Sequence, residues 1–135
     1  MKNKLSLLIS CLFLSSVALV NCNKSDKITV VYPTDCAHRL EGAYLGRDYC
    51  NSSQPAYPCT VTAIDSSNVT FSNLGGVPVT AVLDCGKNSI LIPTQSFSGS
   101  YSLSGTGNYT ASRIIINWSG LSFGVPINCS STFTR

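Results

Sequence analysis

Cysteine is the residue type with the most chemistry to offer in this chain of 135 residues. Five of the seven cysteines are Cys36, Cys50, Cys59, Cys85 and Cys129. Their spacing contains no Cys-x-x-Cys pair, and His38 is the only histidine, so we expect no metal site. In a small exported domain such cysteines pair as disulfides, and an odd number leaves one thiol over.

Ionisable side chains are densest around His38, which has Asp35, Arg39 and Glu41 beside it. This group precedes the first expected strand, where charges are normally solvated, whereas catalytic groups need a cleft. No serine has a Gly-x-Ser-x-Gly setting or an evident base. We therefore expect no catalytic residues, no cofactor and no enzymatic activity.

Residues 1–21 have the features of an export signal. Lys2 and Lys4 precede an apolar stretch from Leu5 to Val20. A membrane-spanning helix needs about 20 predominantly apolar residues, and this stretch is short and interrupted by serines. The alternative is a weak N-terminal anchor helix.

Cys22 ends the sequence Leu19-Val20-Asn21-Cys22, which resembles the lipobox of bacterial lipoproteins. Asn21 stands where such motifs usually have Gly, Ala or Ser, and the alternative is ordinary cleavage that leaves Cys22 a thiol. The resemblance implies lipidation of Cys22 with acyl chains such as palmitate. Two or more chains anchor a protein stably to a membrane, so residues 22–35 are expected to be a lipidated N-terminus and tether.

Charge is scarce in this chain, at 11% of residues, while 44% are hydrophobic. From Cys22 onward seven Lys or Arg stand against six Asp or Glu. Nucleic-acid binding needs a basic surface, and neither a basic patch nor an aromatic–basic pattern is present. We expect no nucleic-acid partner.

Turn signals recur about every eight to twelve residues, which is typical of many short antiparallel strands. The expected strands are 40–50, 59–65, 68–73, 77–84, 89–93, 97–104, 108–118 and 125–135. Glycine-rich connections, among them 75–76, 86–87, 105–107 and 120–124, are expected to be tight turns.

Clean alternation marks the strand at 97–104, where Phe97, Tyr101 and Leu103 oppose a run of serines. Such a pattern is typical of an antiparallel sheet with one buried face. Eight strands joined by short turns predict an all-β fold, an antiparallel up-and-down eight-stranded barrel over residues 36–135. The alternative is a β-sandwich.

Strand order then predicts the disulfides. Strands that alternate up and down place Cys50, Cys59 and Cys129 near one end of the barrel, and Cys36 and Cys85 near the other. Closure brings the last strand beside the first, and Cys50 and Cys129 share the inward parity. We predict the pairs Cys50–Cys129 and Cys36–Cys85, with Cys59 free.

Several segments resemble small lipocalin-like lipoproteins of Gram-negative bacteria over most of residues 40–135. They are 40–50 (LEGAYLGRDYC), 69–76 (VTFSNLGG), 92–95 (IPTQ) and the end from Cys129 to Arg135. The resemblance implies a lipocalin-like barrel and a place in the cell envelope. The expected location is the outer membrane, on its periplasmic or its surface face.

Aromatic residues could line a ligand cavity in such a barrel, and the alternative is that they pack as core. They are Tyr44, Phe97, Tyr101, Tyr109, Trp118 and Phe133. One functional hypothesis is a lipid-anchored, monomeric binding module that holds a small apolar ligand or presents a loop surface. The other is an envelope inhibitor or adhesion module that acts on another protein.

The anchor makes a direct prediction. Cys22→Ala removes the thiol that would carry the lipid, so metabolic incorporation of labelled fatty acid into the protein should be lost. Labelling at the level of the unsubstituted protein would contradict lipidation at Cys22.

Overall fold

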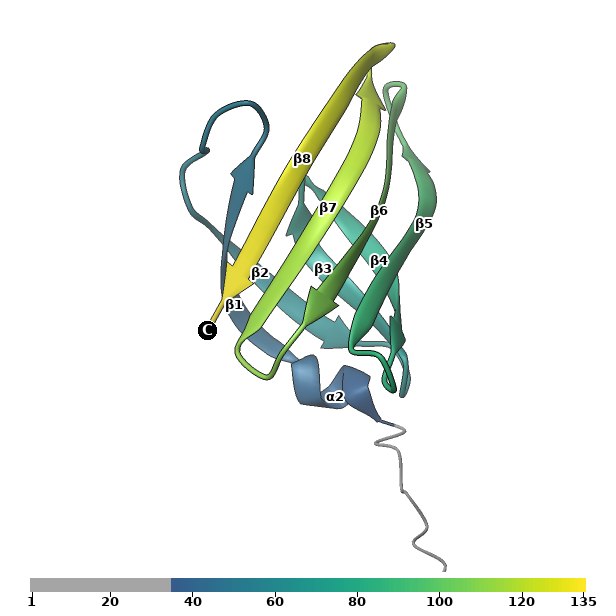
Figure 1. Cartoon of the computed structure of the whole chain (residues 1–135). Helices are drawn as coiled ribbons and strands as arrows, with labels where there is room; N and C mark the ends of the chain where they lie inside the picture. The colour runs from purple at the N-terminus through teal and green to yellow at the C-terminus, as the bar shows by residue number, and fades with distance from the viewer. Residues whose placement is uncertain (1–34) are drawn as a thin grey trace, which may run out of the picture. The chain divides into compact units, whose positions relative to one another are not determined.

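Side chains along the barrel strands alternate between buried and exposed, because successive residues of a strand point to opposite faces of a sheet. The computed structural model describes residues 35–135, and its single sheet closes into a barrel in the order β1 to β8 (Figure 1). The elements are α2 (Cys36–Leu40), β1 (Gly42–Tyr49), β2 (Tyr57–Ala63), β3 (Asn68–Leu74), β4 (Val77–Asp84), β5 (Ser89–Phe97), β6 (Tyr101–Tyr109), β7 (Arg113–Ser122) and β8 (Val125–Thr134).

The barrel closes where β8 pairs antiparallel with β1, in a register that sets Asp48 opposite Ser131. All other pairs join consecutive strands, also antiparallel. This arrangement confirms the predicted up-and-down eight-stranded barrel and not the sandwich. Closure removes the unpaired edges that an open sheet exposes.

Helix α2 is an element that the sequence did not lead us to expect. Asp35 begins it, since its carboxylate accepts a hydrogen bond from the backbone N–H of His38 at 3.3 Å. Cys36, Ala37 and Leu40 form its buried face. A helix of five residues is too short to show a helical period, so residues 36–39 could be taken for irregular chain before the first strand.

A second correction concerns residues 105–107, which lie inside β6 and do not form the expected turn. Gly107 pairs with Ile116 of the neighbouring strand β7, and a Cβ atom at Gly107 would collide with the carbonyl oxygen of Ile115. Glycine is therefore required by the close approach of two strands, not by a reversal. The reversals fall at 98–100 and 110–112 instead.

The barrel interior is filled by apolar side chains. The largest fully buried ones include Phe71, Phe133, Leu74, Leu103, Ile114 and Ile116. Phe71 and Phe133 pack with ring centroids 5.4 Å apart. Each fully buried chain of this kind stabilises the fold by about 1.5–3 kcal/mol.

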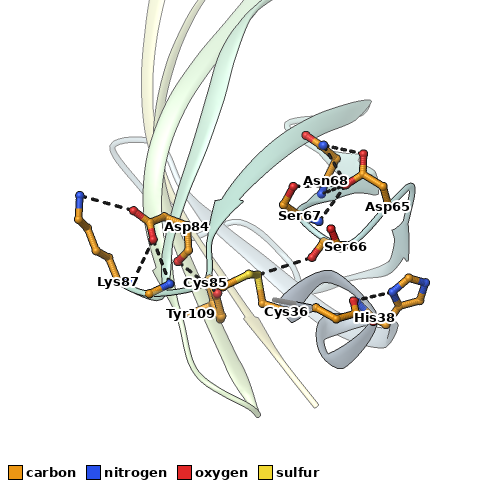
Figure 2. Close-up of a disulfide and its surroundings, with 12 residues drawn as sticks. Cys36, His38, Asp65, Ser66, Ser67, Asn68, Asp84, Cys85, Lys87 and Tyr109 are labelled. Atoms are coloured by element: carbon orange, nitrogen blue, oxygen red, sulfur yellow. Dashed lines mark hydrogen bonds and ion pairs between the residues drawn. A yellow bond between two sulfur atoms is a disulfide. The ribbon is translucent and has the colours of Figure 1, made fainter. Parts of the chain in front are cut away.

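Two disulfides join elements that are distant in sequence. Cys36–Cys85 ties α2 to the residue after β4 (Figure 2), and Cys50–Cys129 ties the end of β1 to β8. Both pairs are those predicted from the strand order, and Cys59 is a buried free thiol. Bridges across 49 and 79 residues restrict the unfolded chain, and each contributes about 4 kcal/mol in the chain-entropy account.

Arg135, the last residue, joins three segments at the end of the barrel that α2 covers. Its guanidinium donates hydrogen bonds to the backbone oxygens of Glu41 at 2.7 Å, Arg39 at 3.0 Å and Ala111 at 2.7 and 3.0 Å. It also lies over the Tyr44 ring, 5.0 Å from the centroid. Carbonyls at a helix C-terminus lack intrahelical donors, and Arg135 supplies them for α2.

Replacing Arg135 by Gln should lower the free energy of unfolding by about 1–2 kcal/mol, because several charge-assisted hydrogen bonds are lost. Arg113→Gln is a matched control, since it removes a positive charge from the same end of the barrel. Urea titration followed by circular dichroism measures both variants. Equal midpoints for Arg135→Gln and the unsubstituted protein would contradict the role given to Arg135.

Candidate functional site

Charged residues divide the barrel into two unlike ends. Along residues 35–135 the chain alternates up and down, so the helix and the turns β2–β3, β4–β5 and β6–β7 share one end, here called the α2 end (Figure 1). This end carries the charged residues Asp35, Arg39, Glu41, Asp65, Asp84, Lys87, Arg113 and Arg135, together with His38.

The opposite end, here called the uncharged end, consists of the four connections 50–56, 75–76, 98–100 and 123–124. None of these segments contains Asp, Glu, Lys, Arg or His. The charged residues nearest to it are Arg47 and Asp48, close to the end of β1, and Asp48 is buried. Unlike the α2 end, this end can be covered by an apolar partner without removing ions from water.

Carboxylates of the α2 end are occupied by their own turns, as Figure 2 shows. Asp65 accepts hydrogen bonds from the backbone N–H groups of Ser67 and Asn68, each at 2.8 Å, and these bonds lower its pKa. The N–H groups of Lys87 and Gly86 do the same for the pKa of Asp84. Both aspartates therefore stabilise turns.

His38 pairs with Asp35 at 2.6 Å, and this hydrogen bond raises the pKa of the imidazole above its ordinary 6.5. Both side chains are exposed. Among residues 35–135 no group of three His, Cys, Asp or Glu side chains could hold a metal ion.

Eight large hydrophobic side chains are exposed in residues 35–135. Four of them lie toward the uncharged end, and the other four, Leu45, Ile64, Val82 and Leu91, lie elsewhere on the barrel. Phe123 is 83% exposed, Val125 62%, Tyr49 59% and Leu121 45%. Phe97 and Tyr101 lie at the same end, half-buried, with ring centroids 5.8 Å apart. An uncharged surface with several exposed aromatic and aliphatic side chains is the candidate functional site, because such patches mark contact surfaces more often than isolated residues do.

A buried polar cluster lies beneath this end. Asp48, 8% exposed, accepts hydrogen bonds from the hydroxyls of Tyr57 and Ser131, each at 2.6 Å. The indole N–H of Trp118 donates to Ser131 Oγ at 2.8 Å. The cluster thereby joins β1, β2, β7 and β8 below the mouth of the barrel.

Gly46 makes room for this cluster. A Cβ atom at Gly46 would lie 2.7 Å from Tyr57 and 2.8 Å from Phe133. Without a side chain at 46, the Tyr57 ring lies over β1, edge-on to Phe133 with centroids 6.2 Å apart, and its hydroxyl reaches Asp48. Substitution of Gly46 would displace Tyr57 from the carboxylate.

The cluster is suited to holding strands together and not to proton transfer. Burial, together with the neighbouring Asp48 carboxylate, raises the pKa of Tyr57 far above its ordinary value of 10, so the phenol stays a donor. Ser131 is fully buried, which keeps substrates from its oxygen. Burial also raises the pKa of the Cys59 thiol and so disfavours the reactive thiolate.

The aromatic residues proposed to line a cavity lie in different places. Tyr44, Tyr109, Trp118 and Phe133 are buried among the core side chains. Tyr109 also borders a hollow of about 330 Å³ beneath α2, beside Arg39 and the Cys36 end of the disulfide. A wider hollow of about 560 Å³ lies along the outer wall of β5 to β8, among outward side chains such as Thr106 and Asn117. Both hollows are outside the filled interior.

Sequence reasoning missed Asp48, Ser131 and Phe123. For Asp48 a signal was present, because it shares the inward parity of Tyr44 and Cys50 in the first strand. Its partner Ser131 is 83 residues away and could be found only through the register of closure. Cys22 lies outside the described residues, so its lipidation stays a prediction.

No family model matches the chain, and no curated protein matches it in a sequence search. The closed eight-stranded antiparallel barrel is consistent with the lipocalin-like resemblance. Within residues 35–135 no helix is long and apolar enough to cross a membrane.

Asp48→Ala should lower the free energy of unfolding by about 2–3 kcal/mol, because it leaves the buried Ser131 hydroxyl and the half-buried Tyr57 hydroxyl without an acceptor. Asp48→Asn keeps an acceptor oxygen of the same shape and should cost clearly less. Urea titration of both variants checks this. If Asp48→Ala unfolds at the midpoint of the unsubstituted protein, the cluster does not stabilise the barrel.

Proposed function

We propose that this protein is a lipid-anchored binding module of the cell envelope that uses the uncharged end of its barrel as its contact surface. The observation that carries the proposal is the coincidence of four charge-free connections with the exposed side chains of Tyr49, Leu121, Phe123 and Val125. The free energy falls when a partner covers water-exposed apolar surface.

Interactions inside the barrel also hold the uncharged end in place. A contact surface that is already ordered loses less conformational entropy when it binds a partner. The Cys50–Cys129 disulfide fixes the start of the 50–56 connection to β8. The Asp48 cluster fixes β1, β2, β7 and β8 below it. The filled interior favours this surface version over a module that encloses a small apolar ligand.

The anchor and the location are parts of the same proposal. They rest on the lipobox-like sequence ending at Cys22, with residues 1–21 as signal peptide and 22–35 as tether. Acylation of Cys22 would hold the module at the outer membrane, on its periplasmic or its surface face.

An envelope inhibitor or adhesion module is the second candidate. The 50–56 connection favours it, because this is the longest loop between strands and a disulfide holds its first residue. Tyr49 at its base is 59% exposed and could contact another protein.

Photo-crosslinking in intact cells tests the contact surface. A benzophenone amino acid at Phe123 should give adducts of discrete mass, and the same group at Ala111, exposed at the α2 end, is the matched control. We expect at least about fivefold more adduct at position 123, since burial of a single aromatic side chain shifts binding by that much or more. Equal yields at both positions would overturn the uncharged end as the contact surface.

A further inference from the structure

The turn between β7 and β8 presents the most exposed aromatic side chain of the described residues. This segment, Leu121 to Val125, is here called the hairpin tip. Phe123 at its apex is 83% exposed, and Leu121 and Val125 on either side are 45% and 62% exposed. In Figure 1 the β7–β8 hairpin rises past the ends of β3 and β4.

The backbone at the apex is costly for the residue that occupies it. Phe123 has φ +51° and Gly124 has φ +81°, so both central residues of the two-residue turn are left-handed. Such turns favour Asn-Gly or Gly-Gly, and a bulky aromatic residue at the first position is unusual. Because the Phe123 side chain is nearly all in solvent, its packing within the barrel does not offset this cost. Unfavourable backbone and unfavourable exposure at the same residue indicate a role outside the fold.

Apolar side chains cover both faces of the hairpin tip. Strand pairing puts Val125 on the inward face, opposite Ser122 and in line with Cys129 and Trp118. Leu121 is on the outward face, opposite Pro126. A folded partner would cover one face of such a hairpin, whereas a lipid phase surrounds it. Phe123 then extends beyond both faces at the apex.

Charge is also absent around the tip. Residues 114–134 contain no charged side chain, and the flanking Arg113 and Arg135 are both at the α2 end. The tip can therefore enter an apolar phase without the cost of desolvating an ion. It also has no cation to attract anionic headgroups.

Backbone pairing limits how deep the tip can go. β7 and β8 pair as far as Ser122 and Val125, so the backbone of the tip is largely hydrogen-bonded within the hairpin. β1, however, pairs with β8 only from Ser130 to Thr134. Unpaired backbone groups on the other edge of 125–129 would be costly in hydrocarbon, so only the apex suits it.

From these observations we infer that the hairpin tip inserts shallowly into a phospholipid bilayer, with Phe123 as the main contact and without a requirement for anionic lipid. The inference deepens the proposed function, on which it rests for the uncharged end as contact surface. Twelve residues lie between Cys22 and Asp35, and the thirteen Cα–Cα steps that join these two residues can span up to about 45 Å. The ten residues of β8 span about 33 Å, so anchor and tip can reach one membrane.

Fluorescence quenching by brominated phosphatidylcholine tests this directly on the full chain reconstituted in vesicles. Trp118 is the only tryptophan and is buried, so it supplies a constant background. Phe123→Trp places a reporter at the tip, and Ala111→Trp places one at the α2 end as the matched control. We expect brominated lipid to quench the added fluorescence of Phe123→Trp by about half or more, and that of Ala111→Trp little, since contact quenching needs burial among acyl chains.

Two further experiments distinguish apolar contact from electrostatic attraction to the membrane. Adding Leu121→Ser and Val125→Ser to Phe123→Trp should weaken partition by about tenfold, because both apolar flanks are lost while the core is untouched. Added phosphatidylglycerol, or a change of salt from about 0.05 to about 0.5 M, should leave quenching unchanged.

Quenching at position 123 no stronger than at position 111 would overturn lipid insertion. Quenching that appears only with anionic lipid would overturn the claim that insertion needs no anionic lipid. If quenching is absent while discrete protein adducts still form at position 123 in cells, the binding module stands and the bilayer is not its partner. Self-association abolished by Phe123→Ser, without quenching, would instead assign the tip to a second copy of the chain and overturn the inference.

Discussion

Closure of β8 onto β1 is the constraint on which the rest of this protein depends. An eight-stranded sheet that failed to close would expose two edges and leave the core side chains of β1 and β8 uncovered. Three unlike interactions secure this one seam in the folded chain. The Ser131 hydroxyl of β8 donates a hydrogen bond to Asp48 of β1, and the Cys50–Cys129 disulfide joins the end of β1 to β8. At the end of β8, Arg135 donates a hydrogen bond to the Glu41 carbonyl, which follows α2.

Closure also creates the difference between the two ends of the barrel. Because the strands alternate in direction, successive connections lie at opposite ends of the barrel. Within residues 35–135, eight of the ten charged residues lie at the α2 end, and the connections at the other end contain none. Asp65 and Asp84 are used to shape turns at the α2 end. At the other end turns rely on glycine and serine, and on Phe123, whose backbone conformation suits glycine better. The contrast supports a division of labour between structure at one end and contact at the other.

Much of the fold could be predicted because its signals are local. Leu103 is buried as the alternation predicts, although residues 98–100 form a turn and not part of a strand. Strand order, closure and parity together were sufficient to pair Cys50 with Cys129. Helix α2 was missed because five residues hold no period, and the strand at Gly107 was missed because glycine serves both turns and close strand contacts. Asp48 was missed as a network centre because its partner is distant in sequence. The exposure of Phe123 was not predicted, because it depends on the exact position of the β7–β8 turn, and the position of a turn is the feature that local sequence determines least well.

Hydrogen–deuterium exchange of the intact protein, with and without membranes isolated from its host cells, tests the division between the two ends most directly. The account predicts added protection in the peptides that cover 50–56 and 121–128, with the α2 end and the β2–β3 and β4–β5 turns unchanged. Protection that falls instead on α2 and the charged turns, or is spread evenly over the barrel, would contradict it.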